Sequence, residues 1–145
     1  MPQVTTPGLQ QRLLDAGIVP TLQRMAVARV LLAGPVHMTA EEVLDAAREH
    51  HIGLSRATVY SALQLFVRCG LLRELPVVGA SVVYDSDTGP HHHLYDVETG
   101  EVVDVPQAQL QILGLTDLLK GLPCAGVDVI VRVRGLSRRQ ALAPG

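Results

Sequence analysis

Apolar residues change their spacing at Gly70, and this change constrains the fold more than any other feature of the chain. Before Gly70 they recur every three or four positions, which is typical of amphipathic helices with one buried face. After Gly70 they occur in short, partly alternating runs separated by Gly and Pro, which is typical of strands. A chain that forms helices first and mainly strands afterwards is predicted to be an α+β protein.

Start and stop signals divide the first part into helices over residues 9–16, 21–33, 39–50 and 56–69. Residues 1–7 before them are predicted to be disordered. Thr39 and Glu42 have the spacing of a capping box, and Ser55 is placed to cap the last of these helices. Two strands should follow, over residues 71–77 and 81–85, joined by a turn at Gly79. Helices that close with a hairpin indicate a winged helix-turn-helix domain, predicted over residues 1–86.

A polar segment rich in Gly and Pro, residues 87–90, is predicted to be a hinge. Beyond it, residues 91–145 should form a small α/β domain with strands over 91–97, 101–105 and 127–134 and a helix over 106–120. Such a domain is too small to bury a comfortable core alone. Dimerisation through it would supply the missing burial, so we expect a homodimer.

Several classes of protein are excluded or disfavoured by the sequence. It has no run of about 18 apolar residues, so we expect no membrane partner. The first residues do not resemble a signal peptide, so we expect a cytoplasmic protein. Residues 1–73 carry seven Arg and five acidic residues, a net charge of +2, whereas the rest of the chain carries −4. This asymmetry is a weak indication that the first domain faces an anion, and ordinary scatter of charge along the chain is the alternative.

The consecutive histidines His91, His92 and His93 are the most unusual local feature. On a strand, His91 and His93 would share one face and His92 would point to the other. With Asp85 before them and Asp104 after them, they form a set of imidazole and carboxylate donors. The alternative, which stays open, is that the histidines form only a solvated or hydrogen-bonded cluster.

Nitrogen and oxygen donors of this kind suit Fe(II), Mn(II) or Zn(II). The set favours Fe(II) or Mn(II), although Zn can bind during purification. Cys69 and Cys124 are the only cysteines, so a structural zinc site of four cysteines is excluded by count.

Seven short motifs, spread over roughly residues 9–134, resemble the ferric uptake regulator family. They are Val19-Pro20-Thr21-x-Gln23-Arg24, His37-Met38-Thr39-Ala40-Glu41-Glu42, Ser55-Arg56-Ala57-Thr58-Val59-Tyr60, Gly70-Leu71-Leu72, Tyr84-Asp85, the His91–His93 triplet, and Asp104-Val105.

The resemblance implies a winged-helix DNA-binding domain joined to an α/β dimerisation domain, with a regulatory metal bound by both. It adds His37, which is unremarkable by itself, to the ligand set. The implied ligands are His37, Asp85, His91, His93 and Asp104. Metal bound from both domains would favour the arrangement that grips DNA.

Two departures from the family pattern matter. Asp96 and Thr99 stand where many members have the first pair of zinc-binding cysteines, so the structural zinc should be absent. Ser61 stands where Arg is frequent, so the operator sequence should differ from the usual one.

Two subgroups of the family are similar to this chain. Asp at positions 85 and 104 resembles the peroxide-stress regulators, in which bound Fe(II) reacts with peroxide and a ligating histidine is oxidised. The run from His91 to Tyr95, the missing cysteines and the ending from Val127 to Arg134 resemble the iron response regulators. In those regulators haem interacts with the histidine-rich segment, here His91, His92 and His93. We favour the peroxide type, because its ligand set matches directly.

The partner implied by the resemblance is a pseudo-palindromic double-stranded DNA operator. Residues expected to contact it are Arg56, Tyr60, Ser61, Gln64 and Arg68 on the last helix, with Arg12 and Arg24 as further phosphate contacts. The alternative for this helix is an ordinary solvated face. We expect a regulator and not an enzyme, because no motif supplies a substrate pocket and a base beside the metal. A metal-dependent hydrolase or dioxygenase, and a partner-binding adaptor, remain the alternatives.

Overall fold

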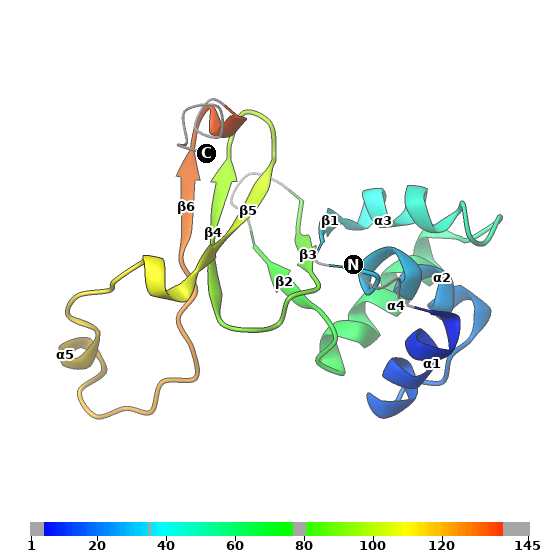
Figure 1. Ribbon diagram of the computed structural model, residues 1–145, viewed down its shortest axis with the longest axis horizontal. Helices are drawn as coiled ribbons and strands as arrows, with labels where there is room; N and C mark the ends of the chain where they lie inside the picture. Colours follow the sequence, from blue (N-terminus) through cyan, green and yellow to red (C-terminus); the bar gives the residue numbers. More distant parts are fainter. Residues whose placement is uncertain (1–4, 35, 77–80, 138–145) are drawn as a thin grey trace. The chain divides into compact units, whose positions relative to one another are not determined.

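The computed structural model (Figure 1) describes residues 5–34, 36–76 and 81–137. The chain divides into two compact units, Met1–Thr88 and Gly89–Gly145. The boundary falls within residues 87–90, where we expected a hinge. That this segment acts as a hinge stays a prediction.

The first unit contains helices α1 (Thr6–Asp15), α2 (Leu22–Leu31), α3 (Ala40–Ala47) and α4 (Arg56–Arg68). Each begins with a hydroxyl side chain that accepts the backbone N–H three residues later, which satisfies one of the free donors at a helix start. These caps are Thr5 with Gly8, Thr21 with Arg24, Thr39 with Glu42, and Ser55 with Thr58. The helices pack around a buried core of mainly Leu, Val and Ala side chains, with Phe66 on α4 fully enclosed.

The prediction that residues 1–7 are disordered is wrong for residues 5–7, because α1 begins at Thr6. The Thr5 hydroxyl accepts the Gly8 N–H at 3.2 Å, and Pro7 lies in the first turn of the helix. Proline is favoured there, because its backbone angle suits a helix and its missing N–H is not needed.

A three-stranded antiparallel sheet completes this unit, with the order β1-β3-β2 (Figure 1). Its strands are β1 (His37–Thr39), β2 (Arg73–Leu75) and β3 (Val83–Asp85). The hairpin β2–β3 was predicted, although the turn expected at Gly79 lies outside the described residues. Strand β1 was not predicted, because three residues are too few to show an alternating pattern. The helices and this sheet confirm the winged helix-turn-helix domain.

The second unit is built on the strand order β5-β4-β6. β4 (His91–Asp96) pairs antiparallel with β5 (Val102–Pro106) and parallel with β6 (Ile130–Val133). Central strand β4 is buried along almost its whole length, whereas edge strand β6 is not. This sheet confirms the small C-terminal domain of the predicted fold class, although β6 is shorter than the predicted 127–134.

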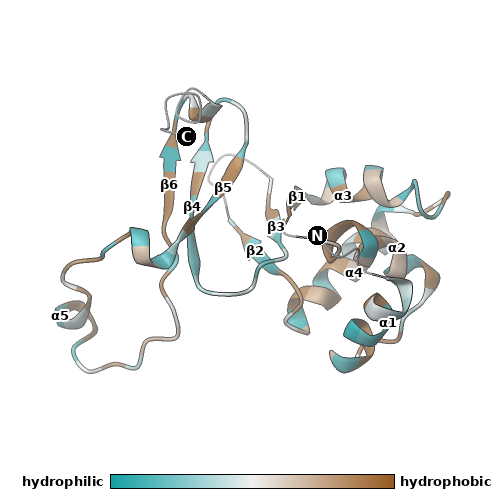
Figure 2. Ribbon diagram, in the orientation of Figure 1, coloured by the Kyte–Doolittle hydropathy of each residue, from teal (hydrophilic) through white to brown (hydrophobic). Residues whose placement is uncertain are grey.

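The predicted helix over residues 106–120 is wrong. In its place are a short 3₁₀ turn, η1 (Gln107–Gln109), and the five-residue helix α5 (Leu115–Leu119). Gly114 breaks the helical path with a positive φ of 78°, and none of the residues of α5 is buried. We call residues 107–129 the arm; it leaves the sheet of its own unit and contains apolar stretches (Figure 2). The described residues include no helix with the length and apolar character needed to cross a membrane.

Candidate metal centre and DNA-facing helix

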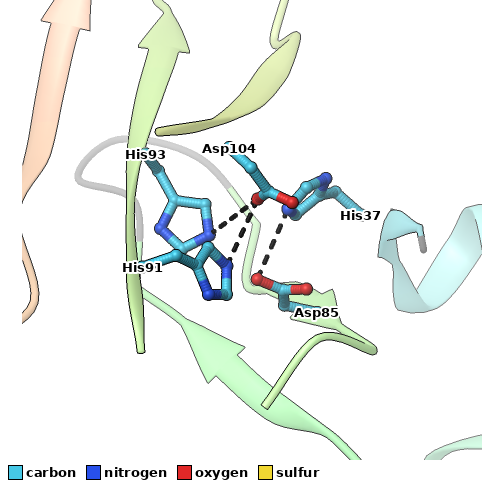
Figure 3. Close-up of side chains that lie close together, drawn as sticks. All are labelled: His37, Asp85, His91, His93 and Asp104. Atoms are coloured by element: carbon cyan, nitrogen blue, oxygen red, sulfur yellow. Dashed lines mark ion pairs between the residues drawn. The ribbon is translucent and has the colours of Figure 1, made fainter. Parts of the chain in front are cut away.

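The pairing of β1 with β3 creates the first group of candidate ligands. His37 and Asp85 lie directly opposite each other in this ladder. Nε2 of His37 lies 3.3 Å from Oδ2 of Asp85, whose side chain is almost completely buried (Figure 3). The other carboxylate oxygen, Oδ1, accepts the backbone N–H of Asp87 at 2.9 Å. The turn after β3 therefore holds the orientation of the carboxylate.

The second group comes from β4 and β5. His91 and His93 share one face of β4, and His93 lies opposite Asp104 on β5. Their Nε2 atoms lie 3.2 and 3.4 Å from Oδ1 of Asp104, and their ring centroids are 4.4 Å apart (Figure 3). Both imidazoles are buried. The alternation along one strand thus brings two imidazoles to one carboxylate.

Hydrogen bonds assign the ring nitrogens of His91 and His92. Nδ1 of His91 donates to the Gly89 carbonyl at 2.6 Å, so in the neutral imidazole the lone pair lies on Nε2, the atom 3.2 Å from Oδ1 of Asp104. This kind of outer contact fixes the tautomer of metal-binding histidines. His92 lies on the opposite face, and its Nδ1 accepts the backbone N–H of Val129 at 3.1 Å. His92 therefore ties β4 to the segment before β6.

The donor atoms in both groups suit a divalent transition metal. The ligand atoms within each group lie within 4.8 Å of one another. Two atoms bound to one ion at about 2.1 Å are roughly 3.0–3.4 Å apart at the angles of octahedral or tetrahedral geometry. The imidazole–carboxylate distances of 3.2–3.4 Å match that separation. Imidazole and carboxylate without thiolate favour Fe(II), Mn(II) or Zn(II).

Helix α4 presents one polar face and one apolar face. Val59, Leu63 and Phe66 are buried in the core of the first unit. The residues predicted to contact DNA from this helix are all exposed: Arg56, Tyr60, Ser61, Gln64 and Arg68. The helix can therefore offer these side chains to a ligand without disturbing the core.

Three of the candidate DNA-binding arginines already have acceptors within the first unit. Arg12 donates to the Leu32 carbonyl at 3.1 Å, and Arg24 donates to the Val19 carbonyl at 2.9 Å. Arg56 forms two hydrogen bonds to the carboxylate of Glu41. Contacts of these arginines with DNA stay predictions.

The structural role of Asp96 was missed by the sequence analysis. Its buried carboxylate accepts the backbone N–H groups of Leu136 at 2.7 Å, Glu98 at 2.8 Å and Thr99 at 3.3 Å. The donors at Leu136 and Glu98 lower the pKa of Asp96, although burial opposes this shift. A signal was present, because Asp side chains commonly accept the backbone N–H two residues on, and Gly100 indicates a turn directly after Asp96.

The sequence model of the ferric uptake regulator family matches residues 15–116 of this chain. The chain belongs to the ferric uptake regulator family. Members of this family are metal-responsive transcriptional regulators. The identification confirms the resemblance found in the sequence motifs.

Individual relatives agree with this membership. The peroxide-responsive repressor PerR of Staphylococcus aureus strain Mu50 is 35% identical over 98 residues, which cover 68% of this chain and 66% of that protein. The ferric uptake regulator of Pseudomonas aeruginosa, solved with manganese, is 29% identical, with a TM-score of 0.68 over 86% of this chain and 96% of that one. The Campylobacter jejuni peroxide stress regulator shares the fold at 23% identity, with a TM-score of 0.66 over 88% and 93% of the two chains.

Proposed function

We propose that this member of the ferric uptake regulator family is a dimeric DNA-binding repressor that requires one divalent metal ion per chain. Its ligands would be His37, Asp85, His91, His93 and Asp104. The observation that carries the proposal is the group on β4 and β5, where strand register aligns two imidazoles with one carboxylate. That group offers three donors and the His37–Asp85 pair offers two, so neither group alone fills an octahedral site.

Both groups serving the same ion would link metal binding to DNA binding. Asp85 ends strand β3 of the first unit. His37 begins strand β1, which leads directly into the capped helix α3. A ligand that binds one arrangement of the two units more tightly shifts the population toward that arrangement. A coupling of about 1–3 kcal/mol would change DNA affinity roughly 5–150-fold.

We propose Fe(II) or Mn(II) as the metal and peroxide as the signal. The carboxylates at positions 85 and 104 support this assignment, and the S. aureus relative is named for its response to peroxide. Bound Fe(II) would supply the electron that peroxide needs for reaction, whereas Mn(II) would not do so readily. The imidazoles of His37, His91 and His93 would be the groups open to oxidation, because all three would bind the same ion.

The test measures binding of a fluorescent operator by the full-length protein. The operator is first selected from random double-stranded DNA with the Mn(II)-loaded protein. We expect DNA binding with Fe(II) or Mn(II) and much weaker binding without metal. Peroxide should abolish binding only in the Fe(II) form, with an added oxygen on His37, His91 or His93 detected by mass spectrometry.

A matched pair of variants tests the ligand set. Asp104→Asn should lose metal-dependent DNA binding, because it removes the carboxylate that faces two imidazoles. His50→Ala, which changes an exposed histidine after α3, should bind DNA as the wild type does. DNA binding that is independent of metal would refute the proposal. Peroxide insensitivity together with haem-dependent loss of binding would replace peroxide by haem as the signal.

A further inference from the structure

We propose that Glu41 is a specificity-determining residue that occupies the guanidinium of Arg56 in place of a DNA phosphate. Arg56 would then bind DNA only where a well-placed phosphate or base displaces Glu41. This inference rests on the proposed role of α4 in DNA binding. It adds a built-in competitor to the predicted DNA-binding face.

The contact between these residues has the form that a guanidinium also uses with phosphate. Nε of Arg56 donates to Oε1 of Glu41 at 2.7 Å, and Nη2 donates to Oε2 at 3.0 Å. Two parallel hydrogen bonds of this kind define the orientation of both planar groups. Arg56 is the first residue of α4, and Glu41 lies in the first turn of α3, so both side chains extend from rigid elements.

Glu41 is not needed to start its own helix. The capping box of α3 uses Glu42, whose Oε2 accepts the Thr39 N–H at 3.0 Å, and Thr39 in turn accepts the Glu42 N–H. Glu41 is the adjacent acid and contacts Arg56 instead. Its substitution should therefore change the electrostatics of the DNA-binding face and leave the helix intact.

The energetics allow Glu41 to be displaced. Both side chains are exposed, with relative side-chain exposures of 64% for Arg56 and 53% for Glu41. Exposed pairs contribute little net stability because water and salt screen them. A phosphate that DNA holds in position can therefore replace the carboxylate, whereas a poorly placed phosphate gains little from doing so.

Each partner also keeps the other ionised. The hydrogen bonds from Arg56 lower the pKa of Glu41, and those to Glu41 raise the pKa of Arg56. The competitor thus stays charged throughout the neutral pH range. Arg68 lies three turns further along α4 and forms no ion pair within the described part of the chain. It serves as an arginine on the same helix without a competitor.

The experiment compares Glu41→Gln with Glu49→Gln in the full-length, Mn(II)-loaded protein. Both substitutions remove one negative charge from an exposed residue in or just after α3, but only Glu41 contacts Arg56. Affinity for a 25-base-pair duplex of random sequence and for the selected operator is measured at several salt concentrations. Thermal melting confirms that both variants are folded.

We expect Glu41→Gln to bind the random duplex on the order of threefold more tightly, because exposed pairs of this kind are worth only a factor of a few. The slope of log affinity against log salt should steepen by about 0.9, the value for one added phosphate contact. The operator should gain less, so discrimination between the two duplexes should fall. Glu49→Gln should leave the slope unchanged.

Arg56→Ala in the Glu41→Gln background identifies the responsible side chain. It should abolish the gain, whereas Arg68→Ala in the same background should retain it. Equal slopes for Glu41→Gln and Glu49→Gln, or a gain that survives Arg56→Ala, would overturn the inference. Failure of the proposed function would look different. Each protein, wild type or variant, would then bind DNA with the same affinity in the presence and in the absence of metal.

Discussion

At the scale of single residues, Asp96 holds more backbone groups in place than its position in the sequence indicated. Two of its backbone donors belong to the β4–β5 turn and the third belongs to Leu136, after β6. One carboxylate therefore joins the ends of all three strands of the second sheet. A buried, ionised acceptor with several N–H donors is stabilising only while it stays charged.

The pKa of Asp96 is lowered by folding, so acid should favour the unfolded chain. The stabilisation is fully present above the pKa of an unfolded Asp, about 3.9. It is lost as the pH falls through the lower pKa of the folded state. We therefore expect Asp96→Asn to reduce the melting temperature at pH 7 and to have progressively less effect below about pH 4.

Melting followed by circular dichroism from pH 7 to pH 3 measures this difference. Asp45→Asn, at an exposed position of helix α3, is the matched control and should melt like the wild type. An Asp96→Asn variant whose deficit is the same at every pH would contradict the assignment, since an uncharged role does not depend on protonation.

At the scale of elements, Ser86 fastens the β1–β3 ladder beyond the candidate ligands. Its hydroxyl donates to the Gly34 carbonyl at 3.2 Å and accepts the Val36 N–H at 3.0 Å. Its own N–H donates to the Val36 carbonyl at 3.3 Å. These bonds join the end of β3 to the chain that enters β1, so they help to maintain the register that sets His37 opposite Asp85.

Ser86→Ala removes both side-chain hydrogen bonds and should lower the free energy of unfolding by roughly 1–2 kcal/mol. It should also weaken Mn(II) binding, because the His37–Asp85 register loses support. Ser86→Thr retains the hydroxyl and should restore both properties. Urea unfolding and Mn(II) titration followed by electron paramagnetic resonance measure the two effects. Loss of stability with unchanged Mn(II) affinity would restrict Ser86 to a packing role.

The helices, strands and candidate ligands differ in how well the sequence predicted them. Helix α4 was predicted because its apolar period repeats over thirteen residues and Ser55 caps it. His91, His93 and Asp104 were predicted because alternation on a strand is a local property. His37 required the family resemblance, because β1 has three residues and gains its place only by pairing with β3. The helix expected over residues 106–120 failed, because its leucines repeat suitably but have no core to pack against within the described chain.

At the scale of the whole molecule, the arm has exposed side chains that suit a second copy of the chain. Leu113, Leu118 and Leu122 are 87%, 75% and 68% exposed. A five-residue helix has little stability of its own in water. Self-association through the arm would cover these leucines, in keeping with the proposed dimer.

Replacing Leu118 with Asp should therefore shift the protein from dimer toward the 15.6 kDa monomer. Sedimentation equilibrium measures the mass, and operator affinity should fall in parallel because two half-sites are no longer bound together. Leu22→Asp places the same charge on a 75% exposed leucine of α2 and should leave the dimer intact. A Leu118→Asp protein that remains dimeric would place the interface elsewhere.

The alternation of histidines along β4 also limits how genes for such proteins can diverge. His91 and His93 face Asp104, whereas His92 accepts the Val129 N–H on the other face. Loss or gain of one codon within this strand would turn every following side chain to the opposite face. A change before His91 would set His92 beside the carboxylate without a second imidazole. Point substitutions can accumulate around this strand, but lineages that retain the site should not change its length by a single residue.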